Sequence, residues 1–238
     1  MNDDQERSGS GEPIYRYKPR ESEWQTPENP GLFLEEIQDH LAQHIGEVDN
    51  VFHEIVSDLV HLDVLVVPAN DERPFHLLVT SGVSDLPMMV PEGMEEYNRC
   101  ELMIALPPDW PLDEMAFKEE SNYWPVRWLK MLGRLPHEYK TWIGWGHTIP
   151  NGDPPEPIAD TQFSGFMLAP PYFFPPEFFR LTAKSGDIIT FYMVVPLYSE
   201  EMELKLNRGA DALEDLFGQH DIDFVVDPGR PNVALGFE

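Results

Sequence analysis

The sequence predicts a single-domain α/β (α+β) sandwich, in which helices flank a central mixed β-sheet. Apolar runs of strand length alternate along the chain with segments whose apolar residues recur at helical spacing. Two of these runs are apolar almost throughout, which is typical of central strands covered on both faces. No linker interrupts residues 30–230, so one domain with at least five strands is the simplest arrangement.

The first elements are an N-terminal arm and a helix. Residues 1–28 are polar, contain prolines and have no apolar period, so we expect a mobile arm that precedes a folded domain over residues 29–238. A helix is predicted over residues 31–46, ending at Gly46. Its apolar positions, three or four residues apart, are Leu34, Ile37, Leu41 and Ile45.

Four strands and a second helix follow. The strands are predicted at residues 51–58, 61–68, 75–82 and 99–107, because Val, Leu, Ile and Phe dominate them. Cys100 is expected to pack in the last of these strands as a buried, inert thiol. The helix spans residues 125–135, with an apolar stripe that should face the sheet. We expect three tryptophans in this region to be mainly buried: Trp124, Trp128 and Trp142.

The last third of the chain predicts two strands, a bent helix and a final strand. The strands span residues 163–170 and 187–196, and an aromatic, proline-rich surface segment (171–179) lies between them. The helix, predicted over residues 199–217 and extending to about 220, should bend near Gly209. Ser199 is expected to cap this helix, and Glu200 and Glu201 to lie solvated at its positive end. A last strand is predicted at residues 222–228.

The bulk composition points to the cytoplasm. No apolar run reaches the ~18 residues needed to cross a bilayer, and the first residues, MNDDQERSGSGEP, do not resemble a signal peptide. The one cysteine, Cys100, cannot form an internal disulfide, as expected in a reducing compartment.

The net charge is −27, from 43 acidic and 16 basic residues. Such a chain repels nucleic acid and anionic membranes, because both bind through Lys and Arg. It attracts a basic protein partner and speeds its capture at low salt. The alternative is that the acidity only keeps the protein soluble or reflects a salty habitat.

Known catalytic and metal-binding motifs are absent from the sequence. There is no G-x-S-x-G, no P-loop, no G-x-G-x-x-G, no H-E-x-x-H and no paired C-x-x-C, so we expect no metal and no cofactor. LVTSGVSDLPM places Ser81, Ser84 and Asp85 around Gly82. This stretch is either a hydroxyl and carboxylate site or a turn that ends a strand, and turn chemistry favours the second.

A loop rich in Gly and Pro, TWIGWGHTIPNGDPPEP (141–157), has the composition of an active site. His147 and Asp153 could pair as base and orienting group, and a hydrolase that uses them with Asp85 is one hypothesis. No nucleophile stands at a recognisable spacing from them, however. The alternative is a shaped surface loop, anchored on the core by Trp142 and Trp145.

The order of several motifs resembles the suppressor of fused family in its bacterial form. These motifs are FHLLVTSGVSDLPM, ELMIALPPDWP, YWPVRWLKMLGRLPHEY, WGHTIPNGD and VVPLYSEEMELKLNRGADAL. The resemblance implies a mixed α/β sandwich without catalytic activity. It also implies a protein partner, since the animal relative restrains a zinc-finger transcription factor and bacterial members look like immunity proteins of polymorphic toxin systems.

The resemblance places GWGHT near the groove that receives the partner peptide in the animal relative. This sequence departs there, because Gly146 stands where the animal protein has an acidic residue. The net charge and the resemblance together predict neutralisation of a basic toxin domain, with loops 141–153 and 83–98 in contact. The alternative is a scaffold or regulatory protein without a toxin partner. The expected contact residues are Asp85, Trp145, His147, Asn151 and Asp153.

Overall fold

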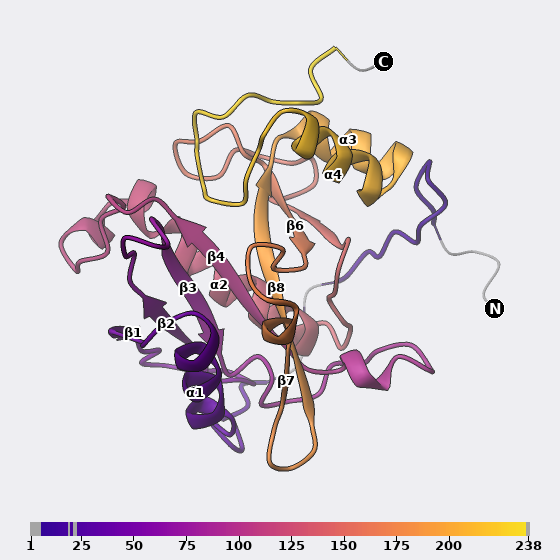
Figure 1. The fold of residues 1–238 in the computed structure, drawn as a ribbon. Coiled ribbons are helices and arrows are strands. Elements are labelled where there is room, and N and C mark those ends of the chain that lie inside the picture. Colours follow the sequence, from indigo (N-terminus) through magenta and orange to yellow (C-terminus); the bar gives the residue numbers. More distant parts are fainter. Residues whose placement is uncertain (1–5, 19, 21–22, 237–238) are drawn as a thin grey trace.

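The computed structural model describes residues 6–18, 20 and 23–236. In this part of the chain an eight-stranded sheet has the order β1-β2-β3-β4-β8-β6-β5, and β7 pairs with β8 (Figure 1). The strands are β1 (Asn50–Phe52), β2 (Asp63–Val67), β3 (His76–Ser81), β4 (Cys100–Leu106), β5 (Thr148–Pro150), β6 (Gly165–Ala169), β7 (Arg180–Thr182) and β8 (Ile188–Leu197). The helices are α1 (Leu34–His44), α2 (Glu120–Glu138), α3 (Ser199–Arg208) and α4 (Ala210–Gln219), with the short 3-10 turns η1 (Glu95–Tyr97), η2 (Ala116–Lys118) and η3 (Pro176–Phe179).

The sheet is mixed because its two halves meet at one parallel pair. β4 and β8 run parallel, with Cys100 opposite Thr190. The other pairs are antiparallel, from β1 to β4 on one side and from β8 through β6 to β5 on the other. The predicted fold class is therefore confirmed.

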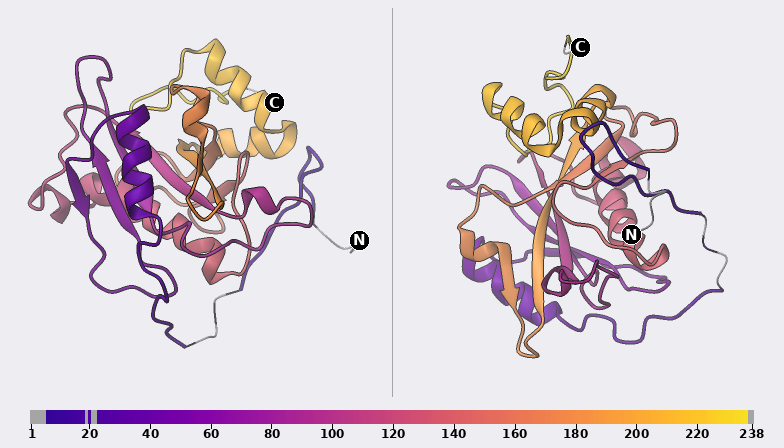
Figure 2. Two further views of the ribbon diagram at one scale, coloured as in Figure 1. Left: turned by 60° about the horizontal axis from the view of Figure 1, so that its bottom comes forward. Right: turned by 90° about the vertical axis from the view of Figure 1, so that its right-hand side faces the viewer.

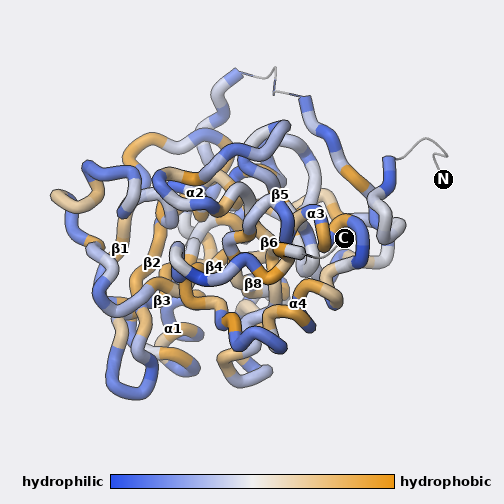
Figure 3. The backbone as a smooth tube through the Cα atoms, turned by 90° about the horizontal axis from the view of Figure 1, so that it is seen from above, coloured by the Kyte–Doolittle hydropathy of each residue, from blue (hydrophilic) through white to orange (hydrophobic). Residues whose placement is uncertain are grey.

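Helices cover both faces of the sheet, so its central strands, such as β2, β4 and β6, are buried on both sides. α1, α3 and α4 share one core with Leu65 and Val67 of β2. The neighbouring residues Val64 and Val66 point to the other face and pack in a second core with α2. Figure 2 shows α1 and α2 on opposite sides of β8, and Figure 3 shows the hydrophobic strands surrounded by hydrophilic segments. Burying each such side chain stabilises the fold by about 1.5–3 kcal/mol.

The predicted burial of the tryptophans and of the cysteine is confirmed. Trp124 and Trp128 are 0% and 5% exposed on α2, and Trp142 is partly buried against the same core. Cys100 is fully buried, and its burial raises the pKa of the thiol well above the ordinary value. The predicted bend at Gly209 is a complete break between α3 and α4, at a glycine with φ of +92°.

Two predicted strands are wrong in extent. The first ends at Phe52 instead of residue 58, because His53 and the amide of Glu54 turn to bind the Asp63 carboxylate. Residues 222–228 form one isolated bridge, between Ala105 and Val225, in place of a strand. There, Phe224 packs into the core below α4 and Val226 into the core below α2.

The expected solvated start of the helix at residue 199 is confirmed for Glu200, which is exposed, and wrong for Glu201. Glu201 is fully buried, and its two carboxylate oxygens accept hydrogen bonds from the Arg230 guanidinium, each at 2.6 Å. Tyr198 precedes the helix and donates its backbone N–H to Glu201. Ser199 is not the cap, since it lies inside α3 and its hydroxyl meets that of Ser164. The buried Glu201–Arg230 pair therefore ties the C-terminal segment to α3.

No helix within the described residues is both long enough and apolar enough to cross a membrane.

Candidate protein-binding surface

The turn after β3 is a structural hub. Gly82 has φ of +118°, and a Cβ there would lie 1.9 Å from the carbonyl oxygen of His61, so only glycine fits. The amides of Gly82 and Ser84 and the Ser84 hydroxyl all donate to one oxygen of the buried Glu101 carboxylate. The interpretation of this stretch as a strand-ending turn is therefore confirmed.

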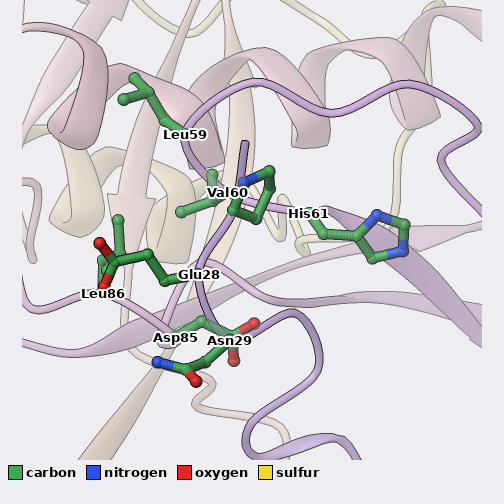
Figure 4. A pocket seen from close by; sticks show the side chains of 8 residues that line it. Glu28, Asn29, Leu59, Val60, His61, Asp85 and Leu86 are labelled. Atoms are coloured by element: carbon green, nitrogen blue, oxygen red, sulfur yellow. The ribbon is translucent and has the colours of Figure 1, made fainter. Parts of the chain in front are cut away.

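Asp85 follows this turn and holds the segment that precedes α1. It is 8% exposed, and its Oδ2 accepts the Gly31 amide at 2.8 Å. Its burial raises the pKa of the carboxyl to about 6, although the amides of residues 31–33 and the Arg99 charge oppose this shift. The small pocket beside it has a volume of about 10 Å³ (Figure 4). That volume holds about one water molecule, so a substrate does not fit next to Asp85.

His147 packs against two aromatic rings. Its ring meets Trp142 edge-on, with centroids 4.2 Å apart, and lies 6.5 Å from the ring of Tyr15. Burial, aided by the Lys205 charge, lowers the pKa of His147 to about 4. The imidazole is therefore neutral at pH 7 and is held by packing.

Asn151 and Asp153 lie further along the same loop. Asn151 donates its side-chain amide to the carbonyls of Glu156 and Pro157, which closes the loop on itself. Asp153 is exposed and accepts a hydrogen bond from Arg16 at 2.9 Å. An ion pair exposed to this degree contributes about 0–1 kcal/mol.

The N-terminal arm lies across this loop. The Tyr17 hydroxyl is 2.7 Å from that of Thr141, and its ring stacks on Tyr139 at 5.1 Å. Nearer the N-terminus, the Ser10 amide donates to the carbonyl of Leu206 on α3, where Figure 2 shows the indigo hairpin beside that helix. The described part of the arm is therefore docked on the domain.

The structure does not assemble the hydrolase site. Asp85 binds the segment before α1, His147 packs against aromatic rings, and Asp153 faces solvent beside Arg16. No hydrogen bond among the described residues joins any two of them. They therefore do not form a base and its orienting group in this structure.

A second set of residue types suited to catalysis occurs before β2. The Ser57 hydroxyl is 2.7 Å from Nδ1 of His61, whose Nε2 lies 3.1 Å from Asp63. A hydrolase also needs space for a substrate and donors for its oxyanion. The pocket that His61 helps to line is the one of about 10 Å³ beside Asp85. The same aspartate also binds His53 and the amide of Glu54, so this network fixes the loop before β2.

Metal-binding clusters are not seen in the described part of the chain, where no group of three or more His, Cys, Asp or Glu side chains could hold an ion.

An exposed aromatic surface lies at α4. Trp145, Tyr172 and Phe173 are 53%, 57% and 43% exposed. The Trp145 indole donates to one oxygen of Glu214 at 3.0 Å, and the Tyr172 hydroxyl donates to the other at 3.3 Å. A pocket of about 320 Å³ opens beside them. Trp145 thus contacts α4 instead of anchoring its loop on the core.

Sequence reasoning identified Trp145 but missed the rest of this surface. Its parts come from the segment after β6, from α4 and from residues 222–224, and no local spacing connects such distant segments. The only sequence signal for this surface was the run of aromatic residues and prolines over 171–179. That run does not separate exposed from buried rings, because Phe178 within it is fully buried.

The protein is thus a mixed sheet covered by helices on both faces, with exposed aromatic and acidic side chains at one end. The family profile described as suppressor of fused protein (SUFU) matches residues 58–231, more than half of the chain. The chain therefore belongs to the suppressor of fused family.

Solved structures of the family share the fold. A suppressor of fused homologue from Neisseria gonorrhoeae FA 1090 has a TM-score of 0.60 and 19% identity, over 84% of this chain and 95% of the homologue. The Sufu-Fu complex gives a TM-score of 0.58 at 16% identity, over 87% and 93%. Drosophila Suppressor of Fused gives 0.58 at 14%, over 92% of this chain and 52% of that protein. No curated protein sequence matches the chain.

Proposed function

We propose that this protein is a non-catalytic binding protein of the cytoplasm that neutralises a basic toxin domain. The observation that carries the proposal is the net charge of −27 on a member of this family. A relative is known in complex with a protein, as the Sufu-Fu complex. The alternative is a scaffold or regulatory protein whose basic partner is not a toxin.

The charge acts on the rate of association, and an apolar patch on its affinity. A strongly acidic surface raises the encounter rate with a basic partner at low salt by about 10-fold or more. Exposed aromatic side chains supply the area that holds the complex together. Trp145, at 53% exposure, is the predicted contact with most accessible apolar surface.

The five predicted contact residues take two roles in this proposal. Trp145 and Asp153 are exposed and contact the partner. The other three, Asp85, His147 and Asn151, contact residues of this chain. They hold the contact loops 83–98 and 141–153 in place.

The test is co-expression with the toxin domain encoded beside this gene, with cell survival and complex formation as readouts. We expect survival and an association rate that falls as salt rises. Cells that die as readily with the protein as without it, with no complex at low salt, contradict the toxin role. If no toxin gene lies nearby, capture of a non-toxin basic protein from the native cell supports the scaffold alternative.

A further inference from the structure

The pocket beside α4 combines aromatic rings with carboxylates. Its volume is about 320 Å³, and its wall includes Tyr172 and Phe173 from the segment after β6 and Phe224 from the segment after α4. The Phe173 and Phe224 rings meet edge-on at 5.4 Å, and Tyr172 lies 6.2 Å from Phe224. Two of the three rings therefore stay open to solvent while resting on a buried neighbour.

The rim of this pocket is acidic. Glu214 and Asp215 of α4 and Asp223 beyond it line the same space. The Trp145 indole and the Tyr172 hydroxyl hold the Glu214 carboxylate in position. The two segments that build the pocket, 170–177 and 210–224, contain no Lys and no Arg. The rim charge is therefore not balanced by any basic residue of these segments.

The interior of the protein shows what such a combination binds. The Arg230 guanidinium is bidentate on Glu201 and lies 4.8–5.2 Å from the ring centres of Phe163, Tyr198 and Phe217. Planar guanidinium groups favour such sites, because they stack on rings and form paired hydrogen bonds with carboxylates.

We propose that the pocket formed by Tyr172, Phe173, Glu214, Asp215, Asp223 and Phe224 receives an arginine side chain of a basic protein partner. This inference rests on the proposed function for the source of the arginine. The guanidinium lies against the exposed rings and pairs with the rim carboxylates. Arginine is favoured over lysine, because an ammonium group neither stacks on a ring nor pairs with a carboxylate through two parallel bonds.

The test uses small probes and needs no toxin. N-acetyl-arginine methylamide is titrated into the full-length protein and followed by NMR at the Trp145 indole and at the amides of 172–174 and 214–218. The lysine and glutamine analogues are titrated in parallel. We expect saturable shifts at these positions with arginine, weaker binding with lysine, and none with glutamine.

Two pairs of variants separate the pocket from general acidity. E214Q/D215N removes two rim charges, and E35Q/D39N removes two exposed charges from α1, which lies at the other end of the molecule (Figure 1). F173S removes a ring without changing charge, and M115S removes an exposed side chain elsewhere. We expect binding about fivefold weaker in the first and about two- to fivefold weaker in F173S, with both controls within twofold of the parent. Circular dichroism checks that each variant folds.

The results distinguish failure of the arginine pocket from failure of the toxin role. Shifts spread evenly over the acidic surface, or equal losses in E35Q/D39N and E214Q/D215N, overturn the pocket. Arginine binding here without any complex with the neighbouring toxin contradicts the toxin role alone. A toxin complex that is unaffected by F173S, with no probe binding at the pocket, contradicts this inference alone.

Discussion

Glu101 illustrates how one residue can set a property of the whole domain. Its side chain is completely buried, and its pKa is raised to about 7, chiefly by burial, while hydrogen bonds from Ser84 and Thr80 oppose this shift. The nearby Asp85 charge raises it further. The folded pKa therefore lies above the ordinary value of 4.5. The stability linked to this group is complete below about pH 4.5 and is lost as pH rises through 7.

E101Q should remove that part of the pH dependence. The glutamine carbonyl can accept the bonds of Gly82 and Ser84, and its amide can donate to the Thr80 hydroxyl, which then turns to the carbonyl of Leu102. Between pH 5 and 8, we expect the free energy of unfolding to fall by about 1–3 kcal/mol less than in the parent. Urea unfolding at each pH measures this.

The exposed residue Glu92 gives the control for this prediction, since E92Q should leave the pH slope unchanged. The slope that E101Q retains has contributions of both signs, because Asp85, with its pKa raised to about 6, loses stability as pH rises, whereas His137 and His147, with pKa values lowered to about 4, gain it. If the free energy of unfolding changes equally with pH in E101Q and in the parent over this range, Glu101 is ionised throughout, and the raised pKa assigned to it is wrong.

At the scale of elements, the sequence predicted the long segments well and the short ones poorly. The helices around Ile37 and Trp128 have several turns of apolar period, and Gly209 marks the break between α3 and α4. β5 and β7 have three residues each, too few to show a period.

A charged residue buried in a core was the other source of error. Glu201 was expected to lie solvated at a helix start, and Glu101 stands in an otherwise apolar strand with no partner nearby in the sequence. Their burial depends on Ser84 and Arg230, which are distant in sequence. Tyr172 and Glu214 are 42 residues apart in the sequence, further than either of these pairs, which is why sequence reasoning found only Trp145 at this surface.

The docking of the N-terminal arm on the domain can be tested directly. Tyr17 contributes a ring stacked on Tyr139 and a hydroxyl 2.7 Å from that of Thr141. We expect Y17A to loosen residues 6–18 by about 1–2 kcal/mol, since it removes both contacts. Limited proteolysis should then cleave the arm several-fold faster while the rest of the domain stays intact.

Trp24 provides the matched control in the same arm, because it is 57% exposed. W24A should leave the cleavage rate near that of the parent. Equal rates in Y17A and the parent would show that the arm is not held at Tyr17.

At the scale of the whole molecule, the net charge is the property that most affects stability and association. The 16 basic residues can balance at most 16 of the 43 acidic ones, which leaves 27 negative charges. Some ion pairs are strongly exposed, such as Arg16 with Glu6, and contribute little. Mutual repulsion of the unbalanced carboxylates therefore works against the compact state. The same field that attracts a basic partner in the proposed function thus costs the free protein stability.

Added salt should accordingly stabilise this protein. Screening shortens the range of repulsion from about 30 Å at 0.01 M to about 8 Å at 0.15 M ionic strength, while the exposed ion pairs have little to lose. We expect Tm to rise by a few degrees between these two concentrations of NaCl, because about 1 kcal/mol corresponds to roughly 2–4 °C in a chain of this size. Calorimetry at fixed pH measures the shift, and KCl should give the same result. A Tm that falls with salt would mean that the ion pairs outweigh the repulsion, and that the net charge does not govern the stability of the free protein.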